Sequence, residues 1–385
     1  MEIKEGAEFK NRKRFNLRNF MKRFIVIIVG LILVSLSAFS QSKIGANNFN
    51  NENYIGGLNS RNVPQYNKKL NNSKVDYVVS SRQEFISVLG KIKPGNKIYL
   101  SPNLVVDLSD LSPINIPSNV TFFSNRGEKG SKGALLYSNN FNSQALINIS
   151  GDNVLVFGIR IQGPEGKRFH KGKNSFDGKS DQFIKKNYQK LWKENMYATP
   201  VSAGIVTSSN NVVIENCELY NWTHTAVFIK KGAKDISIMN NYIHDNRRFG
   251  LGYGITIDQG SSTITGNLFV NNNHSVASQG RSGSEYVVKN NIFKEDTIED
   301  SWAVDMHGGA DRKDGTNLAG YRAIVENNTF YLKGTNMAFV IRGTSSEMSK
   351  FRNNKIIKLD KKSKNYYMQT NSKGNFEVSN NSFSN

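Results

Sequence analysis

Short apolar stretches, alternating with polar residues and separated by Asn and Gly, repeat along the second half of the chain. Between residues 210 and 383 one phrase recurs as ENCEL, MNNYI, TGNLF, KNNIF, ENNTF, RNNKI and SNNSF. Its central residue advances by 24, 26, 24, 37, 26 and 27 positions. The phrases centre on Cys217, Asn241, Asn267, Asn291, Asn328, Asn354 and Asn381. A period in the twenties without helical periodicity predicts a solenoid of stacked strands. Leucine-rich repeats share this period, but the chain lacks their LxxLxL pattern, so we predict an all-β fold, a parallel β-helix.

A second set of alternating strands follows the first. After each Asn phrase and a variable loop come AVFIK, GITID, SVASQ, AVDMH and AFVIR, beginning at residues 226, 254, 275, 303 and 338. Because side chains alternate between the faces of a strand, the third and fifth residues of each segment should face outward. Stacking then gives a first outward column of Phe228, Thr256, Ala277, Asp305 and Val340. It gives a second outward column of Lys230, Asp258, Gln279, His307 and Arg342. This second column is the main candidate for a functional site.

The Asn phrases themselves predict structure and not a binding site. In a β-helix, stacked Asn side chains can satisfy the backbone groups of the turns between strands. The single cysteine, Cys217, stands in the same position, so we predict that it is a buried, small apolar residue that forms no internal disulfide.

The N-terminal end of the solenoid is predicted to be covered by a helix. Ser81 can cap a helix over residues 82–92, whose apolar positions lie on one face, and Pro94-Gly95 would end it. Strand Ile98-Tyr99-Leu100 would follow. A helix here would protect the exposed core and strand edge of the first coil.

The phrase SSRQEFISVLGKIKPGNKIYL, residues 80–100, resembles the entry segment of the pectate-lyase-like, right-handed parallel β-helix superfamily. The resemblance covers about residues 77–383. It implies a single-stranded right-handed parallel β-helix and an exported protein related to polysaccharide lyases and epimerases. The superfamily also holds hydrolases and non-enzymatic adhesins, so the resemblance implies the fold more strongly than the reaction.

The first 40 residues predict a signal peptide. A basic stretch precedes the apolar run Phe24 to Leu36, which ends in the small residues Ser37 to Ser40. The run is too short for a membrane span, so we expect a secreted or periplasmic protein without a spanning helix. Residues 41–76, rich in Asn, Ser and Lys, predict a poorly ordered leader, and residues 77–385 form the β-helix domain.

Charge favours a polyanionic partner. The whole chain carries a net charge of +20, and its first 40 residues hold 8 basic and 3 acidic side chains, which leaves +15 on the remainder. For an exported solenoid, acidic polysaccharide fits this excess better than nucleic acid does. The alternative is a lysine-rich surface that only reflects coding bias. We expect a monomer.

Two insertions interrupt the coils. Residues 163–200 interleave ten Lys, Arg and His side chains with six aromatic ones, which suits sugar rings that carry acidic groups. The alternative is a surface excursion anchored by its aromatic side chains. Residues 309–320 form the second insertion, directly after His307. We expect both insertions to border the second column. Gly308-Gly309 would let substrate approach the backbone closely.

Candidate chemistry follows from the residue types. β-Elimination from a uronate needs a cation for the carboxylate, a base for the neighbouring proton and an acid for the leaving oxygen. Arg281, Arg342 or Lys230 could be the cation, and His307 or Lys230 the base. The acid could be Tyr286 or a histidine such as His274, which aligns with Tyr253 and Trp302. We expect substrate contacts from Arg342, Gln279, Asp258, Asp305, Trp302 and His224. An epimerase would use the same first step and reprotonate the opposite face.

Three alternatives stay open. A glycoside hydrolase would need two carboxylates about 5 to 9.5 Å apart, for which Asp258 and Asp305 are the candidates. The same two residues could instead bind Ca²⁺ with backbone and Asn oxygens, although no compact calcium motif is present and no cofactor is firmly predicted. A polysaccharide-binding surface protein without catalysis is the third alternative. His244, directly after an Asn phrase, is predicted to be structural.

Overall fold

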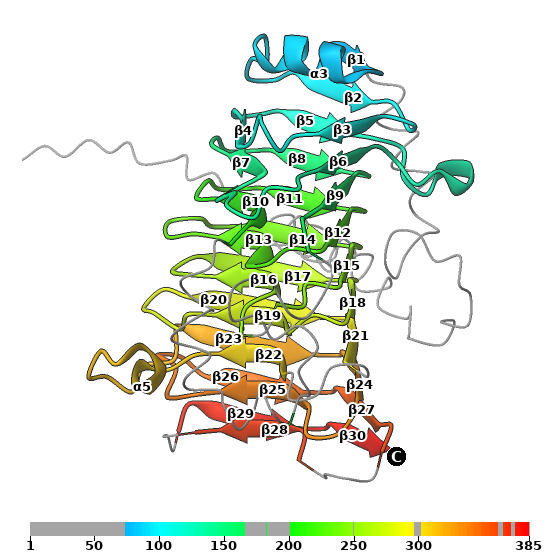
Figure 1. The fold of residues 1–385 in the computed structure, drawn as a ribbon. Coiled ribbons are helices and arrows are strands. Elements are labelled where there is room, and N and C mark those ends of the chain that lie inside the picture. Colours follow the sequence, from blue (N-terminus) through cyan, green and yellow to red (C-terminus); the bar gives the residue numbers. More distant parts are fainter. Residues whose placement is uncertain are drawn as a thin grey trace, which may run out of the picture. The chain divides into compact units, whose positions relative to one another are not determined.

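A computed structural model describes residues 74–165, 182, 201–248, 250–295, 302–360, 365–370 and 374–384. Each complete coil of this part of the chain contributes one strand to each of three all-parallel sheets, and the coils stack along one axis (Figure 1). The predicted signal peptide, nearly all of the leader and most of the 163–200 insertion lie outside the described residues. No helix among the described residues combines the length and apolar character needed to cross a membrane.

The strands of the three sheets are as follows. The 11-stranded sheet contains β1 Tyr77–Val79, β2 Lys97–Leu100, β5 Thr121–Phe123, β8 Leu155–Phe157, β11 Val213–Glu215, β14 Ile236–Met239, β17 Ser261–Thr265, β20 Glu285–Lys289, β23 Arg322–Glu326, β26 Ser349–Arg352 and β29 Phe376–Ser379 in the described chain. The 9-stranded sheet contains β4 Ile114–Ile116, β7 Ile147–Ile149, β10 Ala203–Thr207, β13 Thr225–Ile229, β16 Tyr253–Ile257, β19 His274–Ser278, β22 Trp302–Met306, β25 Met337–Ile341 and β28 Tyr367–Gln369 over the same ranges. The 10-stranded sheet, again within the described residues, contains β3 Val105–Asp107, β6 Leu135–Tyr137, β9 Arg160–Gln162, β12 Glu218–Tyr220, β15 Tyr242–His244, β18 Leu268–Val270, β21 Ile292–Glu295, β24 Thr329–Leu332, β27 Lys355–Lys358 and β30 Ser382–Ser384.

The predicted Asn column is present and sets the coil register. The backbone N–H of Asn241 donates to the side-chain oxygen of Asn267 at 2.9 Å, and Asn267 donates to Asn291 at 2.9 Å. The same ladder continues through Asn328, Asn354 and Asn381. In the Asn-Asn pairs the preceding residue is left-handed, with φ of 55° at Asn240 and 56° at Asn290. Asn tolerates this conformation better than most residues, so one Asn makes the turn and the next stacks inside it.

The ends and the interior also follow the sequence. Helix α3 Arg82–Leu89 is capped by Ser81, buries Phe85 and Val88, and lies at the N-terminal end of the stack (Figure 1). The helix follows β1, so the first strand precedes it, whereas the sequence suggested that strands begin after it. The other helices in the described chain are the 3₁₀ turn η2 Glu128–Gly130 and α5 Gly309–Arg312. Val, Ile, Leu and Phe fill the space between the sheets, and Cys217 is completely buried there, as predicted.

Candidate active site on the 9-stranded sheet

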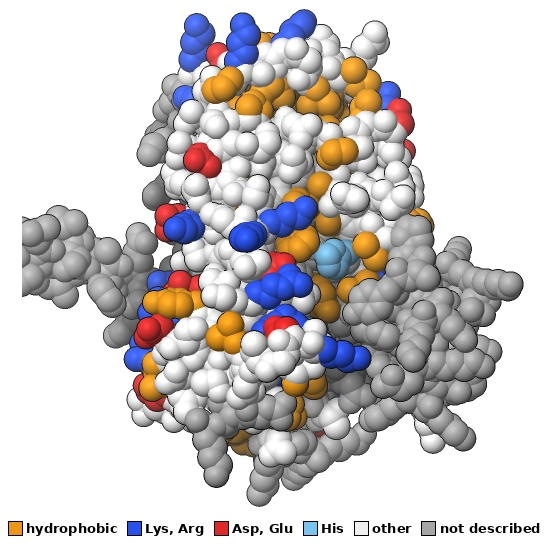
Figure 2. Space-filling view, turned by 90° about the vertical axis from the view of Figure 1, so that its left-hand side faces the viewer, with side chains coloured by type: hydrophobic (Ala, Val, Ile, Leu, Met, Phe, Trp, Pro, Cys, Tyr) orange, Lys and Arg blue, Asp and Glu red, His pale blue; other side chains and the backbone are white. Residues whose placement is uncertain are grey.

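Both predicted outward columns exist on the 9-stranded sheet. Strand pairing aligns Phe228 with Thr256, Thr256 with Ala277, Ala277 with Asp305 and Asp305 with Val340. The parallel ladder continues one residue beyond these strands, where the His307 N–H donates to Ser278 at 3.0 Å and the Arg342 N–H donates to Met306 at 2.9 Å. The second column therefore lies where the strands leave the sheet, and the 309–320 insertion starts beside it. Figure 2 shows basic side chains gathered near the middle of one face, with acidic side chains between them and a histidine beside them.

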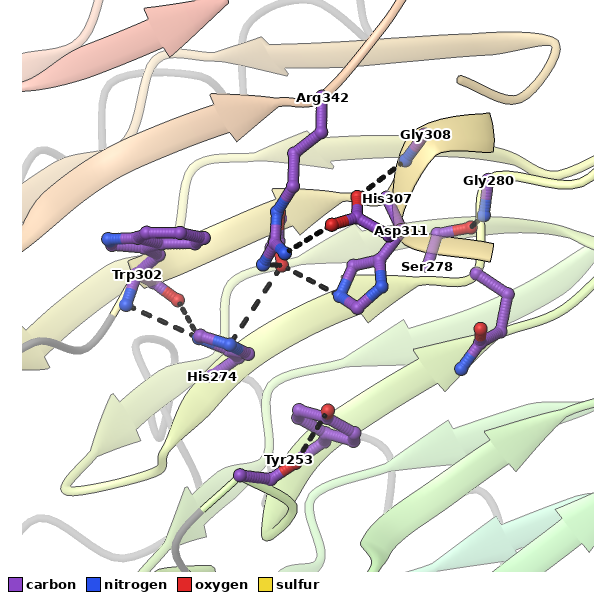
Figure 3. Close-up of polar contacts among 12 residues, drawn as sticks. Tyr253, His274, Ser278, Gly280, Trp302, His307, Gly308, Asp311 and Arg342 are labelled. Carbon is purple, nitrogen blue, oxygen red and sulfur yellow. Dashed lines mark hydrogen bonds and ion pairs between the residues drawn. The ribbon is translucent and has the colours of Figure 1, made fainter. Parts of the chain in front are cut away.

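Asp305 is the centre of the polar cluster. Its side chain is completely buried, and Oδ2 lies 3.0 Å from Nε2 of His307. Figure 3 shows the imidazole of His307 beside the guanidinium of Arg342. Arg342 donates from Nε to Oδ1 at 3.1 Å and also contacts Oδ2 through Nη2. Burial disfavours the charge of Asp305, but Arg342 and His307 outweigh burial, so the pKa of this carboxyl lies below its ordinary value. Asp305 is thus a permanent carboxylate that binds a guanidinium and an imidazole.

A stack of three rings reaches this carboxylate through its middle member, His274. Tyr253, His274 and Trp302 stack across three neighbouring strands, with ring centroids 5.5 and 5.8 Å apart. Nε2 of His274 lies 3.9 Å from Asp305, and its Nδ1 lies 3.0 Å from the Trp302 carbonyl. Burial lowers the pKa of His274 to about 4, more than the nearby Asp305 raises it. His274 is therefore neutral at neutral pH, which makes it a poor proton donor and corrects its candidacy as the acid.

The second insertion adds an unpredicted carboxylate. Asp311, in α5, accepts from the Gly308 N–H at 3.0 Å and from Nη1 of Arg342 at 3.2 Å. Arg312 donates to the Gln279 carbonyl at 2.7 Å and to the Leu318 carbonyl at 2.9 Å. These contacts hold α5 against β19 and β25. The alternation of apolar and polar positions carries no signal for Asp311, because the insertion has no strand register.

The glycines after His307 serve coil packing. A Cβ atom on Gly308 would lie 1.5 Å from the Arg342 carbonyl oxygen, and one on Gly309 would lie 2.1 Å from that of Thr316. Neither distance is compatible with a side chain. The expectation that these glycines admit substrate is therefore replaced by a packing requirement, with the neighbouring coil for Gly308 and within the insertion for Gly309.

The remaining candidates lie along the same edge. Arg281, about half exposed, forms an ion pair with Asp258. Lys230 is exposed, with its Nζ 5.5 Å from the ring centre of Phe228. His224 contacts the edges of Phe228 and Tyr253, and burial lowers its pKa to about 4. These residues form the part of the face on the N-terminal side of His307.

Tyr286 does not belong to this site. It lies in β20 of the 11-stranded sheet, its side chain is completely buried, and burial raises its pKa well above the ordinary value. The alternation in EYVVK places Tyr286 and Val288 on the inner face, so strand periodicity could have excluded it. We therefore remove Tyr286 from the proton-transfer set.

The predicted carboxylate pair also does not fit the geometry, whereas the calcium alternative, which would use backbone and Asn oxygens as well, stays a prediction. Asp305 is buried against Arg342 and cannot donate a proton, whereas Asp258 lies in the other column and binds Arg281. Among the described residues, no group of three or more His, Cys, Asp or Glu side chains could hold a metal ion. Asp258 and Asp305 therefore act separately, each with an arginine.

Comparison with known proteins agrees with this architecture. Residues 118–293 match the family model described as "Right handed beta helix region". The chain has the right-handed parallel β-helix fold. No curated protein matched the sequence. Because the family model stops at residue 293, the match contains β16 and β19 but not Asp305 or His307.

Solved structures of the same fold include polysaccharide-acting enzymes. A family 28 exopolygalacturonase from Yersinia enterocolitica aligns with a TM-score of 0.53 and 14% identity, covering 81% of this chain and 66% of that enzyme, just under two thirds of its length. An alginate lyase from Paenibacillus sp. aligns with a TM-score of 0.40 and 14% identity, covering 78% and 99%. An endo-xylogalacturonan hydrolase from Aspergillus tubingensis aligns with a TM-score of 0.45 and 11% identity, covering 80% and 93%. At 14% identity the likeness to the exopolygalacturonase shows the fold alone.

Proposed function

We propose that the second-column face binds an acidic, uronate-containing polysaccharide and that His307 transfers a proton there in a β-elimination that cleaves the polymer. The observation that carries this proposal is the contact between Nε2 of His307 and the buried carboxylate of Asp305. An ionised Asp305 favours a proton on Nε2, which leaves Nδ1 as the basic nitrogen. Within the described residues no hydrogen bond of Nδ1 is present, and the side chain is 20% exposed.

The chemistry needs one proton acceptor and one cation. The base takes the proton from the carbon beside the carboxylate, a carbon–carbon double bond forms, and the bond to the leaving oxygen breaks. The protonated His307 can then give the proton to that oxygen when both groups lie on one face of the sugar. This assignment uses a single histidine, which removes the need for Tyr286 or His274 as a separate acid.

Arg281 and Lys230 are the cations that can reach a substrate carboxylate. Arg281 is 48% exposed, and an exposed ion pair such as Arg281–Asp258 is weak enough to exchange for a bound anion. Arg342, by contrast, is engaged by Asp305 and Asp311 and is only 19% exposed. The substrate carboxylate is therefore assigned to Arg281 or Lys230. The net charge of +20 and the polysaccharide-acting enzymes of this fold support the choice of polymer.

Hydrolysis of a similar polymer is the second candidate function. It is favoured by the partly exposed carboxylates of Asp258 and Asp311 on this face, which are 20% and 31% exposed. A hydrolase would use such a pair as acid and base or nucleophile. Its products would carry new reducing ends without a double bond.

The test is incubation of the protein, without residues 1–40, with a panel of acidic polysaccharides, measuring reducing ends and the ultraviolet absorbance of unsaturated uronate together. The proposal expects both signals to rise in step. Arg281→Ala should raise KM about 10-fold, because a charged hydrogen bond contributes about 1.5 to 3 kcal/mol. Arg322→Ala is the matched control, since Arg322 also pairs with a carboxylate, Glu285, but on the 11-stranded sheet. Reducing ends without absorbance would support hydrolysis. No cleavage of any acidic polymer would overturn the enzyme assignment.

A further inference from the structure

We propose that Arg342 is a positioning residue for His307, which acts through Asp305, and that Asp311 of α5 supplies the opposing charge. The inference rests on the proposed function only where it concerns catalytic rate. This role is distinct from substrate binding, because the guanidinium N–H groups of Arg342 donate to carboxylates of the protein itself.

Each nitrogen of the Arg342 guanidinium group contacts a carboxylate of the protein. Nε and Nη2 face the two oxygens of Asp305, and Nη1 donates to Asp311 at 3.2 Å. The flat side of the group lies 4.4 Å from the ring centre of Trp302. A planar guanidinium that is bonded on every nitrogen and stacked on an indole has little capacity left for a ligand. Burial disfavours the charge of Arg342, but Asp305 and Asp311 outweigh burial and raise its pKa.

The geometry links Arg342 to the imidazole through one atom. Oδ2 of Asp305 contacts both Nη2 of Arg342 and Nε2 of His307. Without the arginine, the buried Asp305 would have the histidine as its main partner, and the pair would hold a proton to higher pH. Arg342 therefore keeps Asp305 ionised and shares its Oδ2 atom with His307.

Charges from each neighbouring element contribute to this balance. Asp305 lies in β22, which His307 follows, neutral His274 comes from β19, and Arg342 directly follows β25. Asp311 and Arg312 come from α5, and the Asp258–Arg281 pair lies on the β16 side. Asp311 carries the charge opposite to that of Arg342 and contacts it directly. Removing one or the other should shift the proton equilibrium of His307 in opposite directions, which a purely structural role would not produce.

The experiment compares Arg342→Gln, Arg342→Lys and Asp311→Asn with the parent protein. The imidazole titration midpoint of His307 is followed by NMR with labelled histidine, with the resonance assigned by His307→Asn. We expect Arg342→Gln to raise the midpoint by about one pH unit and Asp311→Asn to lower it by about half a unit. Arg342→Lys should restore the midpoint, because it keeps the charge. Arg322→Gln is the control and should leave the midpoint unchanged.

The kinetic arm uses the pH dependence of kcat/KM. Arg342→Gln should move the acidic limb to higher pH and lower kcat about 10-fold with little change in KM, since the residue touches no substrate. Midpoints that shift in the same direction in Arg342→Gln and Asp311→Asn, or that do not move, would overturn the inference. If Arg342→Gln does not fold, an unchanged His307 midpoint in Asp311→Asn would by itself overturn the inference. Opposite midpoint shifts in a protein that cleaves no polysaccharide would uphold the positioning role and refute the proposed function.

Discussion

His244 and His307 both contact carboxylates, but on different sheets, and His244 does so through both ring nitrogens whereas His307 does so through one. In β15, Nδ1 of His244 lies 2.8 Å from Asp245 and Nε2 lies 3.1 Å from Glu218. Its ring also stacks on Tyr220 and Tyr242, with centroids 4.9 and 4.0 Å away. His307 contacts its carboxylate through Nε2 alone in the described structure. A histidine with both nitrogens and both faces occupied is a structural element, whereas one held at a single nitrogen can exchange a proton.

The charged neighbours of the two histidines also differ. Burial opposes protonation of His244, but Asp245 and Glu218 outweigh burial and raise its pKa. Glu218 has a lowered pKa despite its burial, because His244 and the buried Arg126 stabilise its charge. On the other sheet Arg342 contacts both carboxylate oxygens of Asp305, whereas His307 contacts one of them. The position of the arginine thus separates a structural cluster from a candidate catalytic one.

The largest expected difference is in activity. His307→Ala should lower kcat by about 10² to 10⁴, because general acid or base catalysis contributes that much. His244→Gln, the matched control on the 10-stranded sheet, should keep kcat within about 3-fold and lose stability instead. Both variants are measured with the polysaccharide that the parent protein cleaves, after circular dichroism confirms the fold. Comparable losses of kcat in the two variants would remove the distinction.

The sequence predicted the coil register and the outward columns better than it predicted the side-chain contacts. Asn241, Asn267 and Asn291 gave the coil register, and strand alternation then placed Asp305 and His307 in two outward columns. Register does not reveal partners, because the pairing of Arg342 with Asp305 depends on side chains that bend across columns. It also does not reveal Asp311, which comes from an insertion without periodicity. Outward orientation did not mean exposure for Asp305, since Arg342, His307 and His274 lie against it.

The next effect is on stability, and it should be larger on the 9-stranded sheet. Asp305→Ala would leave the mostly buried Arg342 with only the partly exposed Asp311 as partner, at a cost of about 3 kcal/mol in unfolding free energy. Glu218→Gln should cost less, because Glu218 is 21% exposed and glutamine can still accept from His244. Urea denaturation followed by circular dichroism measures both. A smaller loss in Asp305→Ala than in Glu218→Gln would show that Arg342 does not depend on Asp305.

A third effect is the pH dependence of the His244 cluster. Since the folded-state pKa of His244 is raised, its contribution is fully present below the unfolded value of about 6.5 and is lost as pH rises through the folded pKa. Because the pKa values of Glu218 and Asp245 are lowered, these two carboxylates keep their contribution to stability until the pH falls through those values. The difference in unfolding free energy between parent and His244→Gln should therefore be greatest near pH 6, at roughly 1 kcal/mol, and shrink toward pH 9. A difference that grows with rising pH would contradict the raised pKa.

The smallest effect tests whether the side that carries His244 is purely structural. Cys217, directly before Glu218, begins the Asn ladder: its N–H donates to Asn241 at 2.8 Å, and its Sγ lies 3.7 Å from the Val156 carbonyl. In the next coil, the side-chain amide of Asn241 donates to the equivalent carbonyl, that of Ile214, at 2.9 Å. An asparagine at 217 would thus find an acceptor already in place, and its own oxygen could accept from the backbone of the preceding coil, where the thiol now lies. Each added hydrogen bond contributes about 1 kcal/mol, against the cost of burying an amide.

We expect Cys217→Asn to raise the unfolding free energy by up to about 1 kcal/mol and to leave kcat unchanged, while Cys217→Asp, which would bury a charge, should lower stability. Loss of polysaccharide cleavage in a stable Cys217→Asn protein would show that the two sheets are coupled and that the His244 side is more than a scaffold.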